Sequence, residues 1–301
     1  MSIYSYSVLI TVAEQMSFTK AAAVLNLTPS AISHMIAKLE DNFGFPVFIR
    51  GQKSLQLTED GAQILRFVQN AVNACSLLDQ RAVQIRGLTQ GVLRLGTINS
   101  VAVNWLPDIL KRYREEFPAV DLKIVQSGYN RLIQDMTMNK LELAFVSHSS
   151  IKNLDTAFQF IPLLKDRLMC VSPTTFTPIN KDFVTVDEIK NMNLIFHEDG
   201  DEVDISAFLR MSHLTNTSNF SIFNDASLVT MVKCGFGHSI MAELSLKGLN
   251  TDDISIYPIV PFACRELGLI TASPKHLTPT AQKMVEHIQN YVAEYGGQRT
   301  P

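Results

Sequence analysis

Two helix-start signals near the N-terminus constrain the fold of this chain more than any other feature. Ser17 precedes the run 18–25, and Thr28-Pro29 precedes a run that extends to about Asn42. A Ser or Thr side chain caps a helix by accepting a hydrogen bond from a backbone N–H of the first turn, and proline suits the first helical position because it has no N–H. An apolar pattern at helical spacing over 4–15 precedes both signals, so the sequence predicts three consecutive helices.

The third of these helices has two distinct faces. Its apolar side chains follow the spacing i, i+3, i+4, i+7, which predicts one buried face, at Ile32, Met35, Ile36 and Leu39. The opposite face carries small or polar side chains, namely Ser30, Ser33, His34, Ala37 and Lys38. Two short strands, 47–50 and 54–57, follow with a polar turn between them and predict a hairpin, or wing. The pattern of residues 1–60 is therefore typical of a winged helix-turn-helix.

Thr58 is a candidate cap for a much longer helix that extends to about Arg86. Its apolar positions alternate in steps of four and three, as in a heptad repeat, at Ile64, Val68, Ala71, Cys75, Leu78, Ala82 and Ile85. A domain of about sixty residues needs no apolar stripe of this length, so we interpret 58–87 as a linker and dimerisation helix. Packing of the whole helix on its own domain is the alternative.

Beyond a linker at 87–91, strands and helices alternate. Strands at 92–96, 120–126 and 141–147 enclose helices at 101–117 and 130–139, which predicts an α/β domain with a mostly parallel sheet. The region 160–173 is interpreted as two short strands split by Lys165-Asp166. The remaining predicted elements are helices at 186–192, 204–213, 226–234 and 278–295, and strands at 194–197, 219–223, 239–241, 254–260 and 265–272.

Charge alone does not identify a nucleic-acid-binding protein. The net charge is −3, and residues 1–60 contain four basic side chains against five acidic ones. DNA-binding domains are usually basic, so a three-helix module for protein contacts stays open as an alternative. Such a protein would bind a small molecule and use its N-terminal helices for protein contacts.

The DNA-binding interpretation depends on where the polar side chains lie. A helix-turn-helix inserts the N-terminal half of its second helix into the major groove, where short polar side chains contact base edges and lysines contact phosphates. The wing would touch the adjacent backbone. We expect the following residues to contact double-stranded DNA: Ser17, Lys20, Thr28, Pro29, Ser30, Ser33, His34, Lys38, Arg50 and Lys53.

The stretches SFTKAAAVLNLTPSAISHMIAKLEDNFGFPVFIR at 17–50 and LQLTEDG at 55–61 resemble the N-terminal domain of LysR-type transcriptional regulators. The matching features are the Ser-Phe-Thr entry, the alanine pair, the serine-containing third helix, a Leu-Glu pair and a closing Val-Phe-x-Arg. Two residues depart from the family pattern: His34 stands where arginine is common, and Thr28 where glutamine or serine is common. The resemblance extends over the whole chain. It implies a sequence-specific regulator of transcription that forms a homodimer or homotetramer.

The resemblance also implies an effector-binding domain at 91–301, built like a periplasmic binding protein. Lobe one would comprise 91–161 with 266–301, lobe two would comprise 162–265, and a small-molecule effector would bind between them. Strand ends and helix starts supply the candidate contacts, at Asn99, Ser100, Gln126, Ser127, Gly128, Ser147, His148, His197 and Asn224, with Glu198 and Asp225 beside the last two. Ser100 is the preferred anchor because it resembles the serine or threonine usual in the family. An acidic run over 198–204 indicates either a solvated loop or a cationic or polar effector.

Enzymatic function is not expected. The chain contains no GxGxxG motif that opens a helix, no GxxxxGK[ST], no HExxH and no GxSxG, and its seven histidines lack metal-ligand spacing. The four cysteines are far apart in the sequence and indicate reduced, mostly packed thiols, with a two-cysteine redox sensor as the lesser alternative. We therefore expect no catalytic residues, no metal and no cofactor. The N-terminus has no secretory signal and no apolar run could span a membrane, so a cytoplasmic protein is expected.

Overall fold

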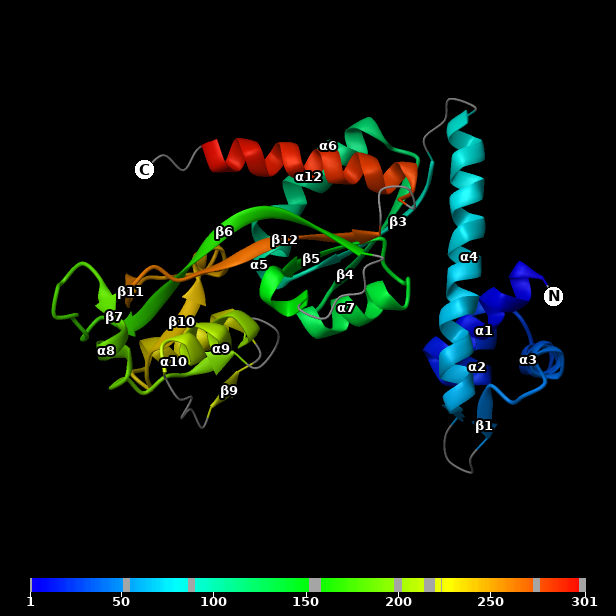
Figure 1. The fold of residues 1–301 in the computed structure, drawn as a ribbon, viewed down its shortest axis with the longest axis horizontal. Coiled ribbons are helices and arrows are strands. Elements are labelled where there is room, and N and C mark those ends of the chain that lie inside the picture. The colour runs from blue at the N-terminus through cyan, green and yellow to red at the C-terminus, as the bar shows by residue number, and fades with distance from the viewer. Residues whose placement is uncertain are drawn as a thin grey trace. The chain divides into compact units, whose positions relative to one another are not determined.

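The computed structural model describes residues 2–50, 55–85, 90–151, 158–197, 202–213, 220–222, 224–272 and 277–297. Contacts between residues divide the chain into two units. The first comprises 1–88 with 137–140, and the second comprises 89–136 with 141–301. Figure 1 shows the elements of both units.

The described part of 1–88 forms the following helices and strands of the first unit (Figure 1): α1 (Ile3–Gln15), α2 (Phe18–Leu25), α3 (Pro29–Phe43), the hairpin β1 (Phe48–Arg50) and β2 (Leu55–Leu57), and α4 (Glu59–Ile85). The predicted helix starts are confirmed. The hydroxyls of Ser17 and Thr28 accept hydrogen bonds from the backbone N–H groups of Lys20 and Ala31. The apolar face of α3 is buried at Ile32, Ile36 and Leu39, where it joins apolar side chains of α1, α2, β1 and α4.

Glu40 fixes the connection between α3 and the hairpin. Its Oε1 accepts hydrogen bonds from the backbone N–H groups of Val47, at 2.7 Å, and Phe48, at 3.0 Å. The first turn of α4 also lies close to this connection, because a Cβ on Gly61 would lie 2.2 Å from the carbonyl oxygen of Val47. The leucine-glutamate pair of the sequence pattern is therefore a structural element, in which Leu39 fills the core and Glu40 positions the hairpin.

We expect Glu40→Ala to lower the free energy of unfolding by about 1.5–3 kcal/mol, because two charge-assisted hydrogen bonds are lost and two backbone donors are left without this acceptor. Urea denaturation of the full chain measures the change. The matched control is Asp41→Ala, which removes an exposed carboxylate from the next position of the same helix. Equal stability of the two variants would contradict the role assigned to Glu40.

The second unit contains two α/β lobes (Figure 1). The elements of the first lobe are β3 (Gly91–Thr97), α5 (Asn99–Asn104), α6 (Leu106–Glu116), β4 (Val120–Gln126), α7 (Tyr129–Thr137), β5 (Leu143–Ser147), η1 (His148–Ile151), β12 (Cys264–Ala272) and α12 (Pro279–Gly297). Together with the start of β6 (Phe158–Pro173), these elements enclose one apolar core, centred on Leu95, Trp105 and Phe145.

The second lobe follows along β6 and contains β7 (Val184–Thr185), α8 (Val186–Ile189), β8 (Phe196–His197), α9 (Glu202–Met211), β9 (Ser221–Ile222), α10 (Asp225–Lys233), β10 (Ser239–Ala242), α11 (Glu243–Leu246) and β11 (Ile254–Val260). Alternate residues of β6 enter separate cores on the two faces of its sheet, as the pleat of a strand requires. Cys170 packs with α9 on one face, and Val171 packs with α10 on the other.

The sheet order corrects two predictions. The order is β4-β3-β5-β12-β6-β11-β7, with β10 also paired to β6. Strand β3 runs parallel to β4 and β5, whereas β12 is antiparallel to β5 and β6, and β6 is antiparallel to β10 and β11. The expectation of a mostly parallel sheet is therefore wrong. The interpretation of 160–173 as two short strands is also wrong, because β6 runs without interruption through Lys165-Asp166 and crosses from one lobe to the other.

The helix predicted over 101–117 is likewise two helices, α5 and α6. The break falls at Trp105, and Pro107 lies in the first turn of α6. Proline has no N–H for the helical ladder and its ring crowds the preceding turn, which ends α5. The predicted strands 194–197 and 219–223 are shorter than expected, and the short elements β7, α11 and η1 were not predicted. Within the described ranges, no helix combines the length and apolar character needed to cross a membrane.

Candidate functional site

The N-terminal half of α3 presents a polar surface. Thr28, Pro29, Ser30 and His34 are exposed, and Ser33 is half-buried. Because Ile32 and Ile36 face the core, His34 between them lies on the exposed side of the helix, whereas Met35 packs against the core. Ser30, His34 and Lys38 are spaced by four residues and share one face of the helix, and Lys38 is exposed.

The other predicted DNA-contacting residues surround this helix in the sequence. Ser17 caps α2, and Lys20 is exposed in its first turn. The backbone of Arg50 pairs with Leu55 in the hairpin, but the Arg50 side chain and all of Lys53 lie outside the described residues. The turn between α2 and α3 is tight, since Asn26 adopts a left-handed conformation and the N–H of Leu27 donates to the carbonyl of Ala22. This geometry is that of a helix-turn-helix.

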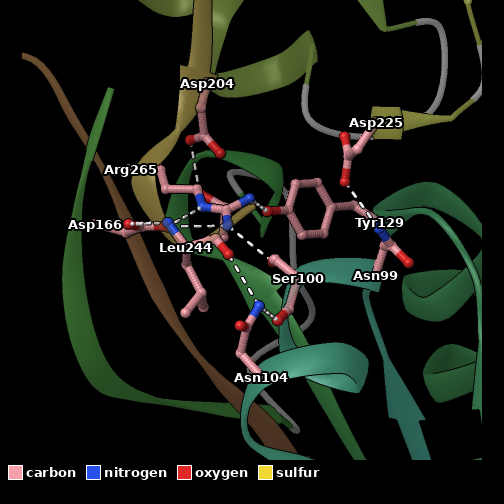
Figure 2. A network of polar contacts seen from close by, with 10 residues as sticks. Asn99, Ser100, Asn104, Tyr129, Asp166, Asp204, Asp225, Leu244 and Arg265 are labelled. Carbon is pink, nitrogen blue, oxygen red and sulfur yellow. Dashed lines mark hydrogen bonds and ion pairs between the residues drawn. The ribbon is translucent and has the colours of Figure 1, made fainter. Parts of the chain in front are cut away.

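Ser100 occupies the centre of a buried polar network in the second unit (Figure 2). Its side chain is 4% exposed, and its Oγ accepts a hydrogen bond from Nη2 of Arg265 at 2.9 Å. The backbone carbonyl of Ser100 accepts from Asn104, whose amide also donates to the carbonyl of Leu244. Ser100, the residue expected to anchor the effector, is thus in contact with the guanidinium of Arg265 from the same chain.

Arg265 is the cation of this network, and the sequence analysis missed it. Its guanidinium is 1% exposed and lies 2.9 Å from Oδ2 of Asp166, which is fully buried. The two residues are register partners on β12 and β6. Nη1 donates to the hydroxyl of Tyr129 on α7, and Oδ1 of Asp166 accepts from the backbone N–H of Leu244. The network therefore ties α5, α7 and α11 to the two strands that cross between the lobes.

Asn99 extends a polar contact from the first lobe to the second (Figure 2). Its Nδ2 donates to Oδ2 of Asp225 at 2.8 Å. Asn99 Oδ1 accepts from Nε2 of Gln126 at 3.1 Å, which leaves the amide nitrogen for Asp225. Asn99 opens α5 and Gln126 ends β4, whereas Asp225 opens α10 of the second lobe. Two predicted site residues are thus brought together, and one of them, Asn99, bonds directly to a carboxylate of the other lobe.

Ser147 makes a second contact between the lobes. Its hydroxyl donates to Oδ1 of Asp204 at 2.6 Å, and both residues are buried. Ser147 ends β5 of the first lobe, and Asp204 lies in the first turn of α9 in the second. Ser147 Oγ in turn accepts from the backbone N–H of Ser149. This orients the hydroxyl proton toward the carboxylate.

The remaining predicted effector contacts have local roles or are not described. Asn224 caps α10 through hydrogen bonds from Ala226 and Ser227, and the carbonyl of Gly128 accepts from Leu132 at the start of α7. The N–H of Ser127 donates to the carbonyl of Thr97.

Of the two histidines in the predicted set, only His148 has a described side chain, and its described contacts lie outside the network. His148 is exposed, 3.8 Å from a carboxylate oxygen of Glu266, with its ring packed on Phe160. The side chain of His197 lies outside the described residues, as do 198–201 of the acidic run.

The cysteines differ in environment. Cys170 is buried, and burial raises the pKa of its thiol to about 11. Partial desolvation of its thiol also raises the pKa of Cys264, although the residue as a whole is exposed. Cys234 and Cys264 are exposed and Cys75 is half-buried, so the expectation of mostly packed thiols is wrong. Among the described residues, no cluster of histidine, cysteine and carboxylate side chains has the arrangement of a metal site.

Sequence comparisons match both units to one family. The family described as "Bacterial regulatory helix-turn-helix protein, lysR family" matches residues 4–62, and "LysR substrate binding domain" matches residues 86–293. The chain is 23% identical to the HTH-type transcriptional regulator YvbU of Bacillus subtilis, over 95% of this chain and 97% of that protein. It is also 23% identical to the HTH-type transcriptional activator CmpR of Synechocystis, over 95% and 94% of the two chains.

Solved structures have the same fold. Full-length OxyR of Pseudomonas aeruginosa superposes with a TM-score of 0.74 at 16% identity, over 97% of this chain and 94% of that one. Full-length CbnR, solved in a complex with its target DNA, superposes with a TM-score of 0.64 at 14% identity, over 97% and 100%.

Proposed function

The chain belongs to the LysR family of bacterial transcriptional regulators, and from that premise we propose that α3 binds the major groove of an operator under the control of a small-molecule effector. The observation that carries this proposal is the exposed N-terminal half of α3. Its polar side chains face outward, while Ile32 and Ile36 fix the opposite face in the core.

The proposed DNA contacts have two roles. Side chains near the start of α3 contact base edges, and basic side chains contact phosphates. The proposed set is Ser17, Lys20, Thr28, Pro29, Ser30, Ser33, His34, Lys38, Arg50 and Lys53. His34 and Thr28 depart from the family pattern, and we place the individual sequence preference of this protein at those positions.

The proposed effector site lies between lobe one, 91–161 with 266–301, and lobe two, 162–265. Ser100, Asn99, Gln126 and Ser147 are its strongest contacts, because each already takes part in the polar network that joins the lobes or their crossing strands. Ser127, Gly128, His148, His197 and Asn224 complete the proposed set. The relatives are named as transcriptional regulators, and we assign this chain no catalytic role.

We propose that α4 pairs with the same helix of a second copy. Val68 packs into the core of the first unit, but Phe67 and Leu78 of the same helix are 68% and 67% exposed. Apolar side chains this exposed on a heptad-patterned helix favour a coiled-coil partner. The resulting homodimer, or a homotetramer built from it, would act on DNA in the cytoplasm.

A mobility-shift titration of the full-length protein on the DNA upstream of its own coding sequence tests the proposal. We expect a discrete complex that survives excess non-specific DNA. Its affinity should decrease linearly with salt on logarithmic axes, because phosphate contacts release counterions. The absence of any salt-sensitive complex with promoter fragments at low salt would refute DNA binding and favour a role in protein contacts.

A further inference from the structure

The two lobes of the second unit are joined by contacts between side chains that a ligand would otherwise meet. We propose that two hydrogen bonds, Ser147–Asp204 and Asn99–Asp225, form a latch that holds the lobes closed without a ligand. Figure 2 shows the contact between Asn99 and Asp225. The regulatory meaning of this latch rests on the proposed effector site, but its existence can be tested separately.

The two partners of each contact lie next to different apolar cores. Ser147 follows Val146, and Asn99 lies on the same short helix as Val101, in the core of the first lobe. Asp204 precedes Ile205, in one core of the second lobe, and α10 carries Asp225 together with Leu228 of the other core. Each contact therefore joins a rigidly packed element of one lobe to a rigidly packed element of the other.

The geometry of each contact is directional. The Ser147 hydroxyl accepts from the N–H of Ser149 and so directs its proton to Asp204. The Asn99 amide oxygen accepts from Gln126 and so directs its nitrogen to Asp225. Both carboxylates belong to residues that are 5% exposed. Hydrogen bonds to carboxylates strengthen when water is excluded, which applies fully to the buried Ser147–Asp204 contact and in part to Asn99–Asp225, where Asn99 itself is exposed. Both contacts favour the closed lobes.

The latch gives the effector a competitor within the chain. Ser147 and Asn99 are two of the proposed effector contacts, and in the latched form their donors are already bound to carboxylates. A ligand that offers oxygen acceptors to these donors must displace Asp204 and Asp225 first. Ligand binding then shifts the population from latched to unlatched lobes, and the size of the shift is set by the difference in affinity between the two forms.

Distance measurements between spin labels on the two lobes of the full-length protein test the latch. One label uses the exposed native Cys234 in the second lobe, and the other uses Lys111→Cys on the exposed side of α6 in the first. Cys75→Ser and Cys264→Ser remove the other accessible thiols. Dilution with unlabelled protein removes distances between copies.

We expect one short, narrow distance distribution in the parent protein. Asp204→Ala/Asp225→Ala should add a longer distance, with the closed-to-open ratio lowered about tenfold or more for each contact removed. Asp187→Ala is the matched control, since it removes a second-lobe carboxylate that is 86% exposed and bonded to Lys190. It should leave the distribution unchanged.

A second variant removes the hydrogen-bond donors of the first lobe instead of the carboxylates of the second. Asn99→Ala/Ser147→Ala should open the lobes to the same extent, and the fourfold variant should open them no further, because each contact can be lost only once. An unchanged distribution in either double variant, with the helix content of the parent by circular dichroism, would overturn the latch. DNA binding in the mobility-shift assay is scored separately, so failure of the latch and failure of the proposed function are distinguishable.

Discussion

Replacing Ser33 and His34 together by alanine should abolish preference for the operator and leave the fold intact. Base-edge contacts each contribute about 1–3 kcal/mol of discrimination, so the loss of two should lower specific affinity by about 30-fold or more. Non-specific affinity should change little, because it comes from phosphate contacts. Competition mobility-shift titrations with specific and non-specific DNA at fixed salt give both values.

The matched control is Asp41→Ala/Asn42→Ala, two exposed polar positions at the other end of α3. Operator preference should survive in that variant. Sedimentation of both variants checks the oligomer, which α4 and not α3 is proposed to form. Loss of oligomers in the Ser33/His34 variant, or undiminished preference for the operator, would show that the DNA-contacting face has been placed wrongly.

Arg265→Met should be the most destabilising single substitution in the second unit. It leaves the carboxylate of Asp166 fully buried without its guanidinium partner, and removal of one member of a buried ion pair costs about 3–5 kcal/mol. The same change withdraws the hydrogen bonds to Ser100 and Tyr129. Urea denaturation of the full chain, followed by the fluorescence of the buried Trp105, measures the effect.

Two further variants separate the charge from the packing. Asp166→Asn added to Arg265→Met should recover part of the stability, because the amide carries no charge yet keeps an oxygen for the N–H of Leu244. Arg112→Met breaks an exposed ion pair with Glu294 and should change stability little. Equal losses from Arg112→Met and Arg265→Met would contradict a special role for burial of the pair.

Local sequence signals predicted the first unit well because its elements are defined locally. Ser17, Thr28 and Thr58 cap helices within a few residues of themselves, and the spacing of Ile32, Ile36 and Leu39 identifies the buried face without reference to distant residues. Glu40 was noted only as part of a pattern, since its partners lie seven and eight residues ahead in a hairpin whose position it helps to determine.

The second unit was predicted less completely because its decisive contacts are distant in the sequence. Asp166 lies in the middle of a strand, and a charge within an apolar run suggested a break. The charge is tolerated because Arg265, 99 residues away, lies beside it in the sheet. A buried charge needs a partner. This requirement is the one sequence signal that could have led to the pair of Asp166 and Arg265.

The predicted effector contacts show the same difference between local signals, which the sequence reveals, and distant partners, which it does not. Strand ends gave Asn99, Ser100, Gln126 and Ser147, all of which take part in the polar contacts of the second unit. The sequence singled out Asp225 and the acidic run that contains Asp204, but it could not pair them with Asn99 and Ser147, nor Arg265 with Ser100, because a cross-lobe contact depends on how the strands return between lobes. The directions of β6 and β12 are set by tertiary pairing, and no local pattern specifies them.

The continuity of β6 determines how the lobes can move once they are unlatched. A loop between two domains swings freely, whereas β6 and β12 cross together as a hydrogen-bonded ladder that includes the register pair Asp166 and Arg265. Opening of the lobes must then twist the paired strands β6 and β12, and these strands resist a larger twist more strongly than a smaller one. In the proposed latch, this resistance would limit the opening angle and favour the return of the lobes when the ligand leaves.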